Sequence, residues 1–125
     1  MGRSASGTDA FAAGGLDEQP EHNATVSSFR LDLYEVTSGR LRRWVKQYAG
    51  APAAGAGAHP RIANSGWQSS WNSKVPATAE ELDRVLHCSY SSYTSDPMWI
   101  ERQPANCFDW YLAFAFCAWD GGRLC

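Results

Sequence analysis

The segment from Trp110 to Trp119 constrains this chain most, because it has the pattern of a helix that is apolar on every side. Asp109 stands where an N-cap is needed, and Gly121-Gly122 follows at the opposite end. A helix without a polar face must be buried all round. Its ten residues are about half of the ~20 that a membrane helix requires. We therefore expect a buried helix in a globular domain and no membrane span.

Periodicity predicts one strand and two more helices. Apolar and polar residues alternate from about 26 to 34, which is the period of a half-buried strand. Thr37 can cap an amphipathic helix that Gly50 ends. That helix places Leu41, Trp44, Val45 and Tyr48 on its apolar face and Arg40, Arg42, Arg43 and Lys46 on a face that we expect to be solvated.

A second amphipathic helix follows the capping box formed by Thr78 and Glu81 and ends near His87. Its acidic first turn, which includes Asp83, complements the helix dipole and is expected to face solvent. Its apolar stripe consists of Leu82, Val85 and Leu86.

The Ala, Gly and Pro-rich segment 49–66 has few large side chains, and we expect it to form a long loop that contributes little core. Two short helices and one strand then offer too little surface to cover the helix at 110–119. Trp67 and Trp71 follow the loop and are interpreted as anchors that pin it to a core. A carbohydrate-stacking pair is the alternative for these two indoles.

Charge and cysteine spacing exclude several classes of function. Eleven Lys and Arg against thirteen Asp and Glu give a formal charge of -2, which argues against a nucleic-acid partner. The four cysteines show no C-x-x-C spacing and the three histidines are scattered, so no zinc site is predicted. Four cysteines in a chain of this length fit an oxidising compartment and allow three connectivities. We favour a disulfide between Cys88 and Cys107, which would staple a polar, turn-rich loop.

Two motifs in order resemble the formylglycine-generating enzyme family, whose domains are also called sulfatase-modifying factor domains. The early motif consists of Glu18-Gln19-Pro20-Glu21-His22 and Val26-x-x-Phe29-x-Leu31-Asp32-x-Tyr34-Glu35-Val36-Thr37. The late motif consists of Gln103-Pro104-Ala105-Asn106-Cys107-Phe108-Asp109-Trp110 and Ala113-Phe114-Ala115-Phe116-Cys117-Ala118-Trp119-Asp120-Gly121-Gly122-Arg123-Leu124.

The resemblance implies an α+β, loop-rich fold similar to C-type lectins, with about three short helices and a few strands. The family pattern continues Arg-Leu-Pro-Thr-Glu, whereas Arg123-Leu124 is followed here by Cys125. We therefore expect residues 1–125 to be the N-terminal part of one domain whose C-terminal half is absent. The resemblance assigns structural roles to Glu35, Thr37, Trp110, Trp119, Gly122 and Arg123.

In the family, the copper-binding cysteine pair and the calcium loops lie in the later half of the domain. The resemblance thus implies no catalytic, cofactor-binding or metal-binding residue in this chain. It also implies that the cysteine at the position of Cys117 pairs with one beyond residue 125, and that the missing half is the expected partner. The family suggests export to the periplasm or cell exterior, although the chain as written has no signal peptide.

Three functions remain open from the sequence. The first is a truncated sulfatase-modifying factor-like domain that is not catalytic by itself. The second is a non-catalytic, exported binding module that uses Trp67 and Trp71 as its contact surface. The third is an oxidase that converts a sulfatase cysteine to formylglycine.

Overall fold

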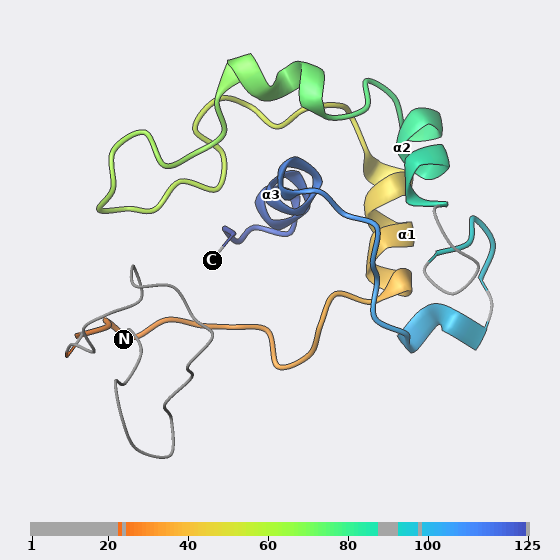
Figure 1. The fold of residues 1–125 in the computed structure, drawn as a ribbon, viewed down its shortest axis with the longest axis horizontal. Coiled ribbons are helices and arrows are strands. Elements are labelled where there is room, and N and C mark those ends of the chain that lie inside the picture. The colour runs from red at the N-terminus through yellow and green to blue at the C-terminus, as the bar shows by residue number, and fades with distance from the viewer. Residues whose placement is uncertain (1–22, 24, 88–92, 98, 125) are drawn as a thin grey trace, which may run out of the picture. The chain divides into compact units, whose positions relative to one another are not determined.

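A computed structural model describes residues 23, 25–87, 93–97 and 99–124 of the chain (Figure 1). Backbone contacts divide the chain into two units, residues 1–32 and 33–125. The described residues of the first unit form neither a helix nor a strand. The second unit contains α1 (Ser38–Gln47), the 3-10 helix η2 (Ser69–Lys74), α2 (Ala79–Leu86), the 3-10 helix η3 (Trp99–Arg102) and α3 (Trp110–Trp119).

The strand predicted for residues 26–34 is not present, and that prediction is wrong. Residues 25–32 are irregular, residues 33 and 34 form a bend, and Phe29, Leu31 and Leu33 are between 62% and 85% exposed. Alternation supplies two faces, but a strand also needs a neighbour to pair with. Within the described part of the chain, β pairing is limited to an isolated antiparallel bridge between Thr37 and Pro104. The described part is therefore helical and loop-rich.

The three predicted α-helices are present, and their N-caps are the predicted ones. The Thr37 hydroxyl accepts from the Arg40 backbone N–H at the start of α1, and the Thr78 hydroxyl accepts from Glu81 N–H at the start of α2. Leu41, Trp44, Leu82 and Leu86 are buried as expected. Val85 was predicted to face the core but is 48% exposed, because the stripe that packs consists of Leu82 and Leu86. The two 3-10 helices were not predicted, since a single turn gives no periodic pattern.

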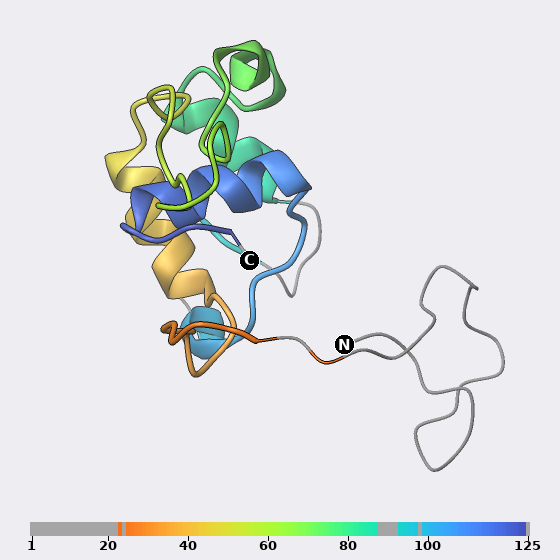
Figure 2. The ribbon, with the colours of Figure 1, turned by 90° about the vertical axis from the view of Figure 1, so that its left-hand side faces the viewer.

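Helix α3 has the predicted boundaries and lies inside the second unit. Asp109 Oδ1 accepts from Leu112 N–H at 2.8 Å, and the Gly122 N–H donates to the Cys117 carbonyl at 2.9 Å. Gly121 has φ +79°, a left-handed conformation that ends helices. Figure 1 shows α3 almost end on, with α1 on one side and the segment between α1 and α2 passing around the other; Figure 2 shows it from the side.

The Ala/Gly-rich segment covers part of α3, a contribution that was not expected of it, while Trp110 of this helix stays 50% exposed. Ala51 and Ala56 pack on the core, and a Cβ added to Gly57 would lie 3.0 Å from Cε1 of Phe114. Small residues therefore contribute core by letting the backbone approach the helix closely. Trp67 is 1% exposed and is joined to the loop by two backbone hydrogen bonds. The Trp67 carbonyl accepts from the Gly55 N–H at 2.8 Å, and the Trp67 N–H donates to the Ala56 carbonyl at 2.9 Å.

Among the glycines of this loop, Gly66 has the least space for a side chain. A Cβ at this position would lie 2.4 Å from the Gly55 carbonyl oxygen, so Gly66→Ala must displace backbone. We expect it to lower the free energy of unfolding by about 2 kcal/mol, measured by urea denaturation. Gly122→Ala is the control, because its Cβ would come no closer than 3.6 Å to a neighbour. We expect it to stay within about 1 kcal/mol of the wild type. Equal losses in the two variants would contradict this account of the loop.

Candidate functional site

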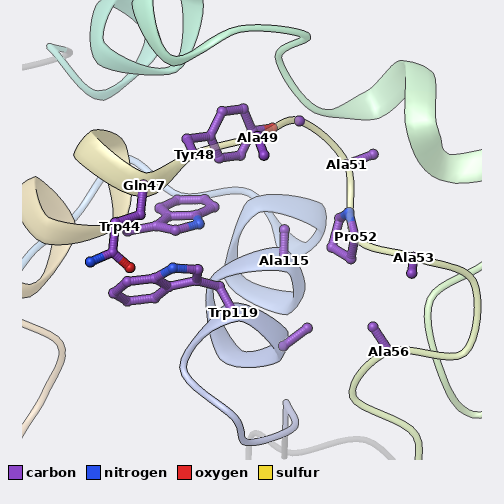
Figure 3. Close-up of a pocket in the computed structure, with 12 residues that line it drawn as sticks. Trp44, Gln47, Tyr48, Ala49, Ala51, Pro52, Ala53, Ala56, Ala115 and Trp119 are labelled. Atoms are coloured by element: carbon purple, nitrogen blue, oxygen red, sulfur yellow. The ribbon is translucent and has the colours of Figure 1, made fainter.

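An open pocket of about 260 Å³ lies between the end of α1, the following loop and α3 (Figure 3). Helix α1 contributes Trp44 and Gln47, and α3 contributes Ala115, Ala118 and Trp119. The loop contributes the remaining lining residues, which are Tyr48, Ala49, Gly50, Ala51, Pro52, Ala53 and Ala56. The Ala/Gly-rich composition therefore shapes one whole side of the pocket.

Two indoles form the other side of the pocket. Figure 3 shows the Trp44 and Trp119 rings lying near one another, with the Gln47 amide beside them. Trp44 is 1% exposed and is fixed by edge-on contacts to Tyr48 and Phe116, with ring centroids 5.3 and 5.5 Å apart. Trp119 is partly buried and contacts Phe116 with a centroid distance of 5.7 Å. These contacts hold the aromatic wall rigidly.

The lining of the pocket is mainly apolar. Tyr48 is the one titratable side chain among the lining residues, and its hydroxyl donates to the Pro76 carbonyl at 2.7 Å. Burial, with a smaller effect of the Glu81 charge, raises the pKa of Tyr48 to about 12. The phenol is therefore neutral near pH 7 and does not act as a base there. The Gln47 amide adds a polar group that could orient a bound molecule.

An aromatic surface, defined here as Trp71, Trp110 and Tyr111, lies over the start of α3. The ring centroids of Trp110 lie 5.2 Å from those of both Trp71 and Tyr111. Trp110 is 50% exposed, whereas Trp67 is 1% exposed and its Nε1–H donates to Asn72 Oδ1 at 2.8 Å. Of the predicted pair, Trp67 thus serves as the anchor, and the surface indole beside Trp71 is Trp110.

A partly buried ion pair joins α1 to η3, and sequence patterns did not predict it. Arg42 is 4% exposed, and its Nε–H donates to Glu101 Oε1 at 3.0 Å, with a second donation from Nη2. Its Nη1 donates to the Thr94 carbonyl, and the guanidinium lies over the Tyr93 ring. The expected solvated face is therefore wrong at Arg42. A Cβ on Gly39 would lie 2.8 Å from Glu101 Oε2, so the glycine leaves room for the pair.

Asp83 extends this cluster to α2, although its turn was expected to face solvent. Its carboxylate accepts from the Tyr93 hydroxyl at 2.9 Å and from the Ser95 hydroxyl at 2.8 Å. Burial and the hydrogen bond to Asp83 raise the pKa of Tyr93. Ser95 also lies 3.2 Å from His87 Nε2, but its shorter bond directs the hydroxyl proton to Asp83. Asp83 and Ser95 therefore link α2 to the segment that follows it, next to His87.

Residues 36–38 and residues 103–105 meet at the start of α1. The Ser38 N–H donates to the Gln103 carbonyl at 3.1 Å, and the Ala105 N–H donates to the Val36 carbonyl at 2.7 Å. Arg40 Nη2 lies 2.6 Å from Asp120 Oδ2, so Arg40 is also paired rather than simply solvated. The end of the early sequence motif therefore lies beside the start of the late one.

Comparison with protein-family models matches residues 1–125 to the Sulfatase-modifying factor enzyme 1-like domain. The chain belongs to this family. No curated protein and no solved structure matches it.

The family's motif residues have local structural roles in this sulfatase-modifying factor-like chain. Thr37 caps α1 and forms the bridge to Pro104, while Gly122 ends α3. Glu35 and Arg123 are exposed. Their family roles, like the binding role of the Trp67 and Trp71 pair, stay predictions.

The cysteine predictions are untested. Cys88 and Cys125 lie outside the described residues, so the disulfide from Cys88 to Cys107 remains a prediction. Cys107 is partly buried with φ +67°, and Cys117 is partly buried on α3. The expected partner of Cys117 beyond this chain also stays a prediction.

Among the residues whose structure is described, no group of three or more His, Cys, Asp or Glu side chains could hold a metal ion. The helices of the described part are also all too short or too polar to cross a membrane.

The ion pair between Arg42 and Glu101 predicts an asymmetric response to mutation. Glu101→Ala leaves a buried guanidinium without its carboxylate, and we expect it to lower the free energy of unfolding by about 3 kcal/mol. Arg42→Met keeps an unbranched apolar chain, and it leaves behind a carboxylate whose side chain is already 37% exposed. We expect a loss of about 1 kcal/mol. Urea denaturation of both variants measures the difference, and a larger loss in Arg42→Met would contradict the proposed burial of the cation.

Proposed function

We propose that this chain is a non-catalytic structural part of a sulfatase-modifying factor-like domain, and that its pocket binds an apolar element supplied by the rest of such a domain. The pocket carries the proposal. It is lined by two indoles, alanines and a neutral phenol, which suits it to bind an apolar side chain and gives it no nucleophile. Residues 1–125 are then the N-terminal part of the domain.

The contact between the two motifs supports a scaffold role. Residues 36–38 and 103–105 are joined by two backbone hydrogen bonds, and Arg42 and Glu101 add a partly buried ion pair. The polar groups that hold α1, η3 and α3 in place bond to one another, and they are not among the residues that line the pocket. We propose that the complete domain has the C-type-lectin-like α+β fold, and that any copper and calcium sites lie outside this chain.

We also propose that the parent protein is exported, because four cysteines in 125 residues suit an oxidising compartment. In that compartment, Cys88 and Cys107 would be joined. This disulfide would staple the segment that leads from α2 to α3.

An oxidation assay tests the non-catalytic proposal. The purified chain is supplied with copper(I), dioxygen and a peptide containing Cys-x-Pro-x-Arg, and the peptide mass is followed over time. We expect the peptide to remain unchanged while an active family enzyme, as the positive control, converts its cysteine to formylglycine. The same preparation should unfold in one cooperative thermal transition, so that inactivity is not a result of misfolding. Dioxygen-dependent conversion by this chain would overturn the proposal.

A second candidate function is carbohydrate binding at the aromatic surface. Trp110 favours it, because this indole is 50% exposed although Trp71 and Tyr111 fix its position. The face of an indole carries partial negative charge and attracts the C–H groups of a sugar ring. The sequence suggested Trp67 and Trp71 as the contact surface. Because Trp67 is buried, this candidate function uses Trp71 and Trp110 instead.

Two tryptophan variants test the carbohydrate candidate. We expect Trp110→Ala to weaken binding of any glycan selected on an array by about tenfold or more, as measured by titration calorimetry. Trp99→Ala is the matched control, because Trp99 is 75% exposed on η3 and lies outside the aromatic surface. An array without a bound glycan, or equal affinity of Trp110→Ala and the wild type, would exclude this function.

A further inference from the structure

Both ring nitrogens of His87, the residue that follows α2, lie close to oxygen atoms of the chain. Nδ1 lies 2.6 Å from the Asp83 carbonyl oxygen, and Nε2 lies 3.2 Å from the Ser95 hydroxyl oxygen. The His87 backbone N–H donates to the Arg84 carbonyl, so it does not provide the usual helical bond to the Asp83 carbonyl. The imidazole takes the place of that donor and caps the C-terminus of α2.

The hydrogen bonds around Ser95 fix where the protons lie. Its hydroxyl donates to Asp83 Oδ2 at 2.8 Å, and a carboxylate oxygen can only accept. The Ser95 oxygen therefore interacts with Nε2 as an acceptor, which requires a proton on Nε2. The Asp83 carbonyl is also an acceptor, so it requires a proton on Nδ1. Both nitrogens carry protons at once only in the imidazolium form of His87.

The charges at the end of α2 favour the same form. Asp83 Oδ2 lies 3.5 Å from His87 Nδ1, and the C-terminus of a helix carries partial negative charge, which attracts a protonated imidazole. Asp96, in the segment that follows, is exposed and adds a further negative charge. Arg84, in the last turn of α2, opposes this attraction weakly, because its side chain is exposed and its charge is screened by solvent.

Tyr93 contacts the other side chains that surround this ring in the described part of the chain. It meets His87 edge on, with ring centroids 5.1 Å apart. Burial, with the hydrogen bond to Asp83, raises the pKa of Tyr93, so this phenol stays uncharged near pH 7. The Tyr93 ring also contacts the Arg42 guanidinium, whose charge is paired with Glu101. The positive charges of these elements are thus either paired or exposed to solvent.

We propose that His87 forms a pH-sensitive link between α2 and residues 93–95. The protonated ring donates to both the Asp83 carbonyl and the Ser95 hydroxyl, whereas a neutral ring has one N–H and keeps one of these bonds. Histidine changes charge between about pH 5 and pH 8, so the link tightens on acidification and loosens as the pH rises. The link lies outside the pocket and does not depend on the function proposed above.

The link acts on the ion pair between Arg42 and Glu101 through the segment that it holds. The Thr94 carbonyl accepts from Arg42 Nη1, and the guanidinium lies over the Tyr93 ring. Loosening residues 93–95 weakens both of these contacts. A change of pH at His87 therefore reaches the contact between α1 and η3.

His59 provides a matched contrast in the same chain. Its Nδ1 accepts from the Arg61 backbone N–H at 3.1 Å, which requires that Nδ1 carry no proton. Protonation of His59 removes a hydrogen bond, whereas protonation of His87 adds one. The contributions of the two histidines to stability should therefore depend on pH with opposite sign.

Urea denaturation of the full chain at about pH 5.5 and about pH 8 tests the link. His87→Gln keeps a polar side chain that takes up no proton. We expect it to raise the equilibrium constant of unfolding about tenfold at the lower pH and less than about threefold at the higher one, because the stabilisation exists where the ring is protonated and is lost as the pH rises. His59→Gln is the control and should have its larger effect at the higher pH. An effect of His87→Gln that is equal at the two pH values, or larger at the higher one, would overturn the proposal.

The nitrogen chemical shifts of the two rings report protonation directly. At about pH 6.5, where a free imidazole is half protonated, the doubly protonated fraction should be larger for His87 than for His59. Ser95→Ala removes the acceptor of Nε2 and should lower this fraction for His87 while leaving His59 unchanged. Equal fractions in the two rings of the wild type, or a His87 fraction that Ser95→Ala does not change, would also overturn the proposal.

Discussion

The burial of α3 is the constraint on which the rest of the second unit depends. A helix with Trp, Leu, Phe and Ala on all sides has no polar stripe to turn toward water, so other segments cover most of it, although Trp110 at its start is 50% exposed. Helix α1 covers it through Trp44 against Phe116, and the long loop covers it through Trp67 against Phe114, with centroid distances of 5.5 and 5.8 Å. The loop backbone needs hydrogen-bond partners where it is buried, and Trp67 supplies them through its own N–H and carbonyl.

Covering α3 also requires that segments distant in sequence be held together, and the chain does this with polar groups. The hydrogen bonds between residues 36–38 and 103–105 fix where the chain enters α1 relative to where it approaches α3. Arg42 and Glu101 act beside them, at a point where the guanidinium is almost fully buried. A buried pair of this kind contributes little net stability, but it penalises arrangements that separate its partners. We interpret it as specifying the position of η3 on α1.

The sequence predicted the features that depend on neighbouring residues. Thr37, Thr78 and Asp109 were identifiable as caps because each bonds to a backbone group within three residues, and α3 followed from its cap, its apolar run and the glycines that end it. The strand at 26–34 failed because pairing depends on a distant segment. The role of Arg42 was missed for the same reason, since Glu101 lies 59 residues away. Of the candidate site, the sequence identified Trp71 but paired it with Trp67, which is buried, and it did not identify the pocket, whose shape depends on the path of the loop.

The pocket is a physical consequence of covering a bulky helix with small residues. Where the loop passes Phe114, glycine lets the backbone approach until a Cβ would touch the ring. Where it passes Trp44 and Trp119, Ala51, Ala53 and Ala56 reach less far than the indoles opposite them, and about 260 Å³ remains between the two walls. In a protein interior of ordinary packing density, side chains would fill a space of this size. The Ala/Gly-rich composition that argued against a contribution to the core therefore covers α3 where the loop passes Phe114 and leaves an open volume where it passes the two indoles.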